Sequence, residues 1–397
     1  MDIRFSERIQ KIRPSAIRNK LFDNPDIITF AAGKPEQSLF PISELAPLAE
    51  NMIKQDGPDA LQYGSTEGLP RLRELIAGER MQSCGVSTDA HCITLTSGSQ
   101  EGIELSARVF VNEGDGIACE SPSYTGAFSA FEPYSPRYIP IPMDENGMIM
   151  EDLEAALKTD PHIKMIYTIP DFQNPTGIAM SDDRRRRLAE LAAEYRVPVI
   201  EDCPYGDLIY EGFRHPSVKS FDQDGWVVTL GSFSKTLCPG LRLGWICAAP
   251  EILEKYALAK QALNLQCGTF DQYLAAAYLE RSDLDLHIEE IKDLYRQRRD
   301  LMLNCIKEYF PLGIVHTRPG GGFFIWVETH PRLDTETLLL EAAAVYKVAY
   351  VPGHSFFADD SHANFIRLSY SFVDLAQIRE GMERLGSLLC KKYKELQ

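Results

Sequence analysis

Residues 229–245 read Thr229-Leu-Gly-Ser-Phe-Ser-Lys235-Thr-Leu-Cys-Pro-Gly-Leu-Arg242-Leu-Gly-Trp245. A short apolar run typical of a strand comes first, and one lysine then stands between two serines and an arginine. Hydroxyl and guanidinium groups can hold a phosphate, and an amine beside them can form a Schiff base with a phosphorylated aldehyde. The segment therefore indicates pyridoxal 5′-phosphate (PLP), although an exposed lysine in a loop after a strand is the alternative for this segment alone.

This segment resembles the lysine site of fold type I PLP enzymes, the aspartate aminotransferase-like superfamily. Within it, the chain is most similar to the branch of 2-aminoadipate, kynurenine and aromatic or branched-chain aminotransferases. The resemblance covers essentially the whole chain, from about Arg13 to the C-terminal helix, in the family's motif order. It implies that Lys235 is the Schiff-base lysine and that Ser232, Ser234 and Arg242 bind the cofactor phosphate.

Composition narrows the classes of function. The 397 residues carry 41 basic and 57 acidic side chains, a net charge of −16, which argues against a nucleic-acid-binding surface. The nine cysteines are scattered without a Cys-x-x-Cys pair, so we expect neither a metal site nor a disulfide framework. No signal peptide or long apolar run is visible, and we expect a cytoplasmic protein that does not enter a membrane.

Short apolar runs alternate with helix-like patterns between about residues 90 and 250, which predicts an α/β fold with a mostly parallel sheet. Ligands bind outside the carboxyl ends of such strands. The expected strands are His91–Thr96, Gly116–Glu120, Lys164–Thr168, Val197–Glu201, Trp226–Gly231 and Gly244–Ala248.

The remaining chain predicts a second domain. A long amphipathic helix is expected from Leu284 onward, followed by strands at Phe323–Val327, Val348–Val351 and Phe365–Ser369. The resemblance implies the fold type I PLP-dependent transferase architecture, with a seven-stranded sheet in a large PLP-binding domain over residues 45–285. It also implies a smaller α+β domain over residues 1–44 and 286–397, whose N-terminal segment closes over the substrate.

The basic block Arg184–Arg187 needs its own interpretation. It follows Ser181 and precedes a Leu-Ala-Glu-Leu run, so we expect a solvated helix face that Ser181 caps rather than a nucleic-acid patch.

The run Thr96-Ser-Gly-Ser99-Gln100-Glu-Gly-Ile103 follows a strand and opens a helix. Backbone N–H groups at a helix N-terminus bind anions, so this run predicts a second phosphate-binding element, although a simple helix cap is equally consistent. The resemblance places Ser99 and Gln100 on the phosphate.

Two polar side chains at strand ends complete the expected cofactor site. Asp202 ends a very apolar strand, where an unpaired carboxylate is costly. The resemblance implies that Asp202 pairs with the pyridine nitrogen of PLP and that Tyr205 and Asn174 donate to its 3′-oxygen. A turn would also explain Asn174-Pro-Thr-Gly177 and the Asp before Pro204.

The resemblance also assigns two tyrosines. Tyr124 would stack on the pyridine ring, whereas a half-buried structural tyrosine is the alternative. Tyr63 matches a tyrosine that reaches the phosphate of the opposite subunit, which implies a homodimer with shared active sites.

Substrate binding is expected from three further residues and from Asn174. Arg367 interrupts an apolar strand and would bind the α-carboxylate bidentately; a surface Arg on an edge strand is the alternative. Gly33 would let the N-terminal segment approach the substrate, and Arg18 matches a helix that tunes side-chain specificity. Cys203 and Cys238 depart from the family pattern and would leave thiols beside the cofactor.

The resemblance implies an aminotransferase that moves an amino group between an L-amino acid and a 2-oxo acid by a ping-pong mechanism. A carbon–sulfur β-lyase or an aminocyclopropane-carboxylate synthase-like enzyme would use the same lysine, aspartate and arginine. A non-enzymatic PLP effector-binding protein is a further alternative, but those regulators carry a DNA-binding domain ahead of the PLP fold, and the motifs here begin near Arg18. Which amino acid is the donor stays open.

Overall fold

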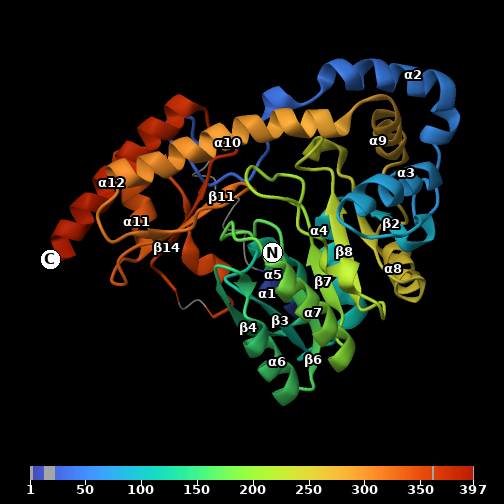
Figure 1. Cartoon of the computed structure of the whole chain (residues 1–397), viewed down its shortest axis with the longest axis horizontal. Helices are drawn as coiled ribbons and strands as arrows, with labels where there is room; N and C mark the ends of the chain where they lie inside the picture. Colours follow the sequence, from blue (N-terminus) through green and yellow to red (C-terminus); the bar gives the residue numbers. More distant parts are fainter. Residues whose placement is uncertain (1–2, 13–22, 360–361, 397) are drawn as a thin grey trace.

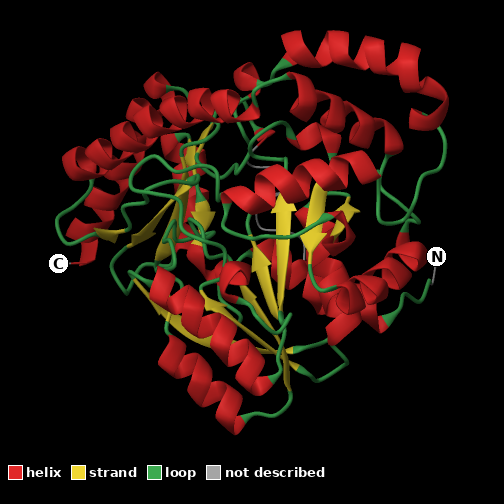
Figure 2. Ribbon diagram, turned by 45° about the vertical axis from the view of Figure 1, so that its right-hand side comes forward, coloured by secondary structure: helices red, strands yellow, loops and turns green. Residues whose placement is uncertain are grey.

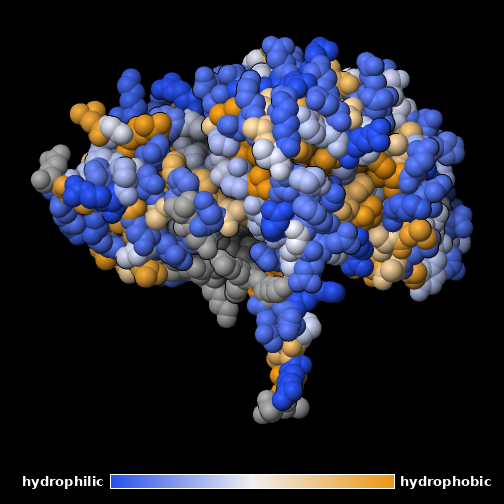
Figure 3. All heavy atoms as spheres, turned by 90° about the horizontal axis from the view of Figure 1, so that it is seen from below, coloured by the Kyte–Doolittle hydropathy of each residue, from blue (hydrophilic) through white to orange (hydrophobic). Residues whose placement is uncertain are grey.

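The computed structural model describes residues 3–12, 23–359 and 362–396. A large sheet and its helices form one side of the molecule, and the C-terminal third forms the other, with the long helix α10 (Leu284–Tyr309) running along the top of both (Figure 1). On the face shown in Figure 3, hydrophobic residues are interspersed among hydrophilic ones. No helix in the described ranges is long and apolar enough to cross a membrane.

The large sheet is mostly parallel, as predicted. In the described part of the chain it has eight strands, one more than expected, because a two-residue strand pairs antiparallel with the end of its neighbour. In spatial order the strands are β2 (Ile93–Thr96), β9 (Gly244–Cys247), β8 (Val227–Ser232), β7 (Val199–Asp202), β6 (Ile163–Thr168), β3 (Gly116–Ser121), β4 (Arg137–Asp144) and β5 (Gly147–Met148). β9 is antiparallel to both of its neighbours, β2 and β8, and β5 is antiparallel to β4, whereas the other neighbouring pairs in the described sheet are parallel.

Strand β4 was not predicted, because it contains Pro140 and Pro142. Proline has no backbone N–H to donate to a neighbouring strand. It is tolerated in a strand where its backbone polar side faces away from that neighbour. The carbonyl of Pro142 accepts from Ile149 N at 2.9 Å, so its polar group points away from β3, and Pro140, two residues earlier, lies on the same side.

Helices cover both faces of the large sheet (Figure 2). Adjacent residues of β8 show why: Val228 packs in one apolar cluster with residues of α4, α5 and α8, whereas Val227 packs in another with residues of α6 and α7. A strand buried on both faces reads as a continuous apolar run, which is the pattern that predicted these strands. The helices are α4 (Ser99–Phe110), α5 (Thr125–Phe131), α6 (Met150–Thr159), α7 (Asp182–Tyr195) and α8 (Pro250–Leu263).

The C-terminal part contains an antiparallel sheet in the order β10-β11-β14-β13, packed against helices α10 and α12. The N-terminal segment packs beside this sheet: Ile28 and Thr29 of β1 pair in parallel with Val348 and Ala349 of β12 in a separate two-stranded sheet, and the Phe30 carbonyl accepts from Ser369 N at 2.8 Å. The elements are β1 (Ile28–Thr29), β10 (Val315–His316), β11 (Phe324–Glu328), α11 (Thr335–Glu341), β12 (Val348–Ala349), β13 (Val351–Pro352), β14 (Phe365–Ser369) and α12 (Leu375–Leu396).

The other described helices and helical turns are α1 (Glu7–Lys11), η3 (Gln37–Leu39), α2 (Ile42–Ala60), α3 (Pro70–Leu75), η4 (Ile76–Met81), η5 (Ala90–Cys92), η6 (Glu132–Tyr134), η7 (Val218–Phe221), η8 (Pro239–Leu241), α9 (Thr269–Arg281), η9 (Ala342–Tyr346) and η10 (Gly353–Phe356).

The prediction for Arg184–Arg187 was wrong for the Ser181 cap and for Arg185. Helix α7 begins after Ser181, whose side chain makes no capping bond, and Arg185 is fully buried. Its guanidinium pairs with Asp171 at 2.6 Å and donates to the Pro170 carbonyl at 2.8 Å. A buried charge needs such partners. Arg185 thereby anchors the loop that leads from β6 to Asn174.

Candidate active site

Three strand ends of the large sheet and one strand of the small sheet meet at Lys235. The lysine follows β8, and its Nζ donates to the Gly33 carbonyl at 3.0 Å. A Cβ at position 33 would lie 2.9 Å from the Phe324 ring, so the close approach of this segment requires glycine. The segment that β1 ties to the small sheet thus reaches the lysine of the large sheet.

The environment of Lys235 favours a neutral amine. Burial, together with the positive charges of Arg242 and Arg367, lowers the pKa of Lys235 to about 8, while the negative charge of Asp202 opposes this shift. Because a neutral amine is the nucleophilic and basic form, Lys235 can attack a carbonyl or take up a proton at mildly alkaline pH.

Asp202 is buried at the end of β7 and is only half satisfied. Its Oδ2 accepts from the Tyr167 hydroxyl at 2.9 Å, whereas Oδ1 is buried without a hydrogen-bond partner in the described chain. Burial raises the pKa of Asp202 to about 7, against the opposing effects of the Tyr167 hydrogen bond and the Lys235 charge. Tyr167 was missed in the sequence, because a tyrosine in a buried strand reads as ordinary core.

Arg367 is buried in β14 between two aromatic rings. Its guanidinium lies 4.2 Å from the Phe324 ring centroid and 5.1 Å from that of Phe356. Its hydrogen bonds within the described chain go to neutral oxygens, Asn174 Oδ1 at 3.0 Å and the Ala31 carbonyl at 2.6 Å, and Nε is left without a partner. Burial lowers the pKa of Arg367 to about 10. An incoming carboxylate would supply the missing negative charge.

Asn174 and the two predicted tyrosines line the same region. Because Asn174 Oδ1 accepts from Arg367, its Nδ2 is the atom that can donate to a bound group. Tyr205 is buried against Phe323 and Phe324, and burial raises the pKa of its hydroxyl, which therefore stays protonated. Tyr124 donates to Gln100 Oε1 at 3.4 Å, which connects this region to the first turn of α4.

The loop before α4 adjoins Arg242. Gly98 is the N-cap of α4 with φ +80°, and a Cβ there would lie 2.7 Å from Arg242 Nη2. Arg242 Nη2 donates to the Ser97 carbonyl at 3.1 Å. Ser99 and Gln100 begin the helix, where backbone N–H groups lack intrahelical partners. Across the site, Ser232 Oγ accepts from Ser234 N at 3.1 Å.

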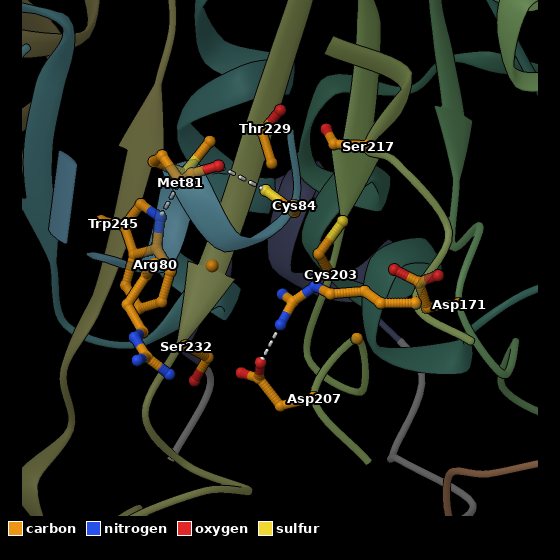
Figure 4. A pocket seen from close by; sticks show the side chains of 13 residues that line it. Arg80, Met81, Cys84, Asp171, Cys203, Asp207, Ser217, Thr229, Ser232 and Trp245 are labelled. Carbon is orange, nitrogen blue, oxygen red and sulfur yellow. Dashed lines mark hydrogen bonds and ion pairs between the residues drawn. The ribbon is translucent and has the colours of Figure 1, made fainter. Parts of the chain in front are cut away.

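Some predicted residues do not join this cluster. The Tyr63 side chain is 79% exposed, and Arg18 lies outside the described residues. Cys203 lines a pocket with Cys84, Asp207 and Trp245, and Ser232 of the expected phosphate site lines the same pocket (Figure 4). Successive residues at a strand end point to opposite faces, which explains why Asp202 does not line this pocket with Cys203.

Both thiols of this pocket are protonated. Burial raises the pKa of Cys84 to about 12 and that of Cys203 well above its usual value. The structure therefore gives no support to Cys203 as a reactive thiol beside the cofactor.

Comparison with known proteins identifies the family. Residues 25–385 match the model of the family "Aminotransferase class I and II". The aromatic-amino-acid aminotransferase 1 of Thermococcus litoralis is 40% identical, over 98% of this chain and 95% of its own. The structure of Pyrococcus horikoshii kynurenine aminotransferase, solved with PMP, superposes with a TM-score of 0.94 at 40% identity, over 98% of this chain and 97% of that one.

A third structure, the α-aminoadipate aminotransferase LysN of Thermus thermophilus with a phosphopyridoxyl-leucine adduct, superposes with a TM-score of 0.91 at 35% identity, over 98% of both chains. The chain therefore belongs to the class I and II aminotransferase family. It has the type I fold of PLP enzymes, and it is a PLP-dependent aminotransferase that moves an amino group between an amino acid and a 2-oxo acid.

The unpaired state of Asp202 makes a prediction for the ligand-free protein. A carboxyl group whose pKa rises from 3.8 unfolded to about 7 folded binds its proton more tightly when folded, so its contribution to stability falls as pH rises from about 4 to about 7. We expect Asp202→Asn to raise the melting temperature at pH 8, with a smaller gain at pH 5, in thermal melts without PLP. A variant that is less stable than wild type at pH 8 would contradict this account.

Proposed function

We propose that Lys235, Asp202 and Arg367 form the catalytic and substrate-binding centre for transfer of the α-amino group of an L-amino acid. The observation that carries this proposal is a buried arginine without an anionic partner beside a buried lysine whose pKa is lowered. The carboxylate of an α-amino acid can pair with Arg367, and its Cα proton can be removed by Lys235. Given the names of the relatives, we propose aromatic, 2-aminoadipate-like or branched-chain donors.

The donor set fits PLP. The orphaned Asp202 Oδ1 suits a protonated pyridine nitrogen, and Tyr205 and Asn174 Nδ2 suit the 3′-oxygen. The N-terminus of α4, with Ser99 and Gln100, would bind the phosphate. Ser232, Ser234 and Arg242 would bind it from the other side, and Tyr124 would lie against the ring. When bound, PLP supplies an electron-accepting ring that stabilises negative charge developing at Cα.

The protein's residues would do the rest. Lys235 would hold the cofactor through Nζ, and with a substrate bound its neutral Nζ would remove the proton from the substrate Cα atom. Arg367 fixes the α-carboxylate, so the Cα–H bond is oriented toward Nζ. Gly33 and the segment around it exclude water from this side. The first substrate would leave as a 2-oxo acid whose carbonyl oxygen comes from water, while its amino group stays in the site. A second 2-oxo acid would then take up that amino group and release the water, which gives ping-pong kinetics.

We propose that the two sheets belong to two domains, residues 45–285 and residues 1–44 with 286–397, with the site between them. Arg18 would contact the substrate side chain. A cytoplasmic location is supported by nine free cysteines, since a reducing compartment keeps thiols unpaired.

We further propose a homodimer in which Tyr63 completes the phosphate site of the partner. Leu61, Tyr63 and Leu265 are 72%, 79% and 55% exposed, and Thr269 Oγ1 holds the loop in place through the Gln62 carbonyl at 2.8 Å. A fixed loop that exposes apolar side chains favours an interface between subunits.

Removing the lysine tests the chemistry. We expect Lys235→Ala to lower kcat by at least about 10³-fold, because it removes the group that moves the Cα proton. After borohydride treatment, peptide mass mapping should find no cofactor attached to the chain. The exposed Lys255→Ala variant is the control, and it should retain the wild-type kcat and the attached cofactor. Cofactor trapped on another lysine would refute the assignment.

Arg367→Lys tests the carboxylate clamp. Lysine keeps the charge but loses the two-pronged donor, so we expect KM for the amino acid to rise about tenfold or more, while PLP affinity changes little. Steady-state kinetics and cofactor titration measure these, with Arg186→Lys on the exposed face of α7 as the control. An unchanged KM would exclude Arg367 as the clamp.

The dimer is tested by sedimentation velocity of the purified protein. We expect a species of twice the 44.7 kDa chain mass at micromolar concentration. The Tyr63→Ala variant should bind PLP more weakly but should remain a dimer. A monomeric active enzyme would count against shared active sites.

A further inference from the structure

A buried carboxylate lies inside the first turn of α4, where an anion is expected to bind. The Glu101 side chain is 6% exposed, and its Oε2 accepts from Ser97 N directly before the helix. Its Oε1 is buried without a hydrogen-bond partner. A carboxylate at this place competes with a phosphate for backbone donors and repels it, so Glu101 alone would weaken an anion site.

A buried ammonium group faces this carboxylate. Lys260 of α8 is fully buried, and its Nζ lies 3.7 Å from Glu101 Oε1. The same Nζ donates to Cys267 Sγ at 3.2 Å. Burial raises the pKa of the Cys267 thiol, which therefore stays neutral. Among its contacts in the described chain, Glu101 is thus the negative charge that Lys260 can balance.

The end of α8 also contacts the loop itself. Asn264 N donates to the Lys260 carbonyl at 2.9 Å, and Asn264 Nδ2 reaches Ser97 Oγ at 3.5 Å. Ser97 is therefore held from three sides, by Glu101 at its N–H, by Asn264 at its hydroxyl and by Arg242 at its carbonyl. The N–H groups of Ser99 and Gln100 lie in the first turn of α4, where backbone donors have no partner within a helix.

We infer that Lys260 is a positioning residue for the cofactor phosphate: it neutralises Glu101 and keeps that carboxylate on Ser97, so that the start of α4 binds the phosphate rather than repelling it. This inference rests on the proposed phosphate role of Ser99, Gln100 and Arg242. Lys260 touches neither cofactor nor substrate, and it acts through Glu101 and the loop.

The test compares PLP with pyridoxal, which lacks the phosphate, in titrations of the full-length protein after removal of cofactor at pH 8. We expect Lys260→Met to weaken PLP binding about tenfold, with pyridoxal binding changed much less, because the unpaired Glu101 charge acts on the phosphate. Glu101→Gln should keep or increase the preference for PLP, since it removes the negative charge. A purely structural role predicts that both variants lose both ligands alike.

Lys255→Met, on the exposed side of the same helix, is the control and should bind both ligands as wild type does. The double variant Lys260→Met with Glu101→Gln should recover the PLP preference. An equal loss of PLP and pyridoxal in Lys260→Met would overturn the inference. If Lys260→Met does not fold, a reduced PLP preference in Glu101→Gln overturns it instead. If wild type itself binds PLP and pyridoxal equally, the proposed phosphate role of Ser99, Gln100 and Arg242 is wrong, and the inference about Lys260 is refuted with it.

Discussion

The site depends on one electrostatic constraint: the buried Lys235 feels the positive charges of Arg242 and Arg367 and the negative charge of a single carboxylate, Asp202. None of the three cations forms a direct ion pair with Asp202 in the described structure, and burial shifts the pKa of three of these four groups toward the neutral form. In a chain with a net charge of −16, this is a local excess of positive charge. The phosphate of a cofactor and the carboxylate of a substrate supply the missing negative charge. Binding of these groups therefore also neutralises the buried cations.

The fold brings these groups together through two sheets. The carboxyl ends of β7 and β8 present Asp202 and Lys235, and β14 presents Arg367 from the small sheet. Asn174, which follows β6 of the large sheet, joins the two, because its Oδ1 accepts from Arg367. A change in the relative position of the sheets would therefore alter the distance between the carboxylate clamp and the lysine. Substrate binding and sheet packing are coupled through that arginine.

Much of the fold was predictable, since buried parallel strands are continuous apolar runs and β14 and the start of α10 lie where the sequence indicates. The failures have local causes. Strand β4 contains two prolines, and Arg185 looks solvated until Asp171, distant in sequence, is placed beside it. The grouping of Asn174, Asp202 and Lys235 followed from strand ends, whereas Arg367 was assigned through the family resemblance. Tyr167 and the Glu101–Lys260 pair gave no signal, because their contacts span 35 and 159 residues and fit no local pattern.

The pairing of β1 with β12 bears on how the molecule is made. Residues 28–33 have their partners near residues 348 and 369, and the Gly33 carbonyl reaches Lys235 only from that attachment. On the ribosome, the early segment must wait until more than three hundred further residues have emerged. The large sheet can fold before then, but the segment that covers the lysine takes its place last, so Lys235 stays open to solvent until the C-terminal part has folded.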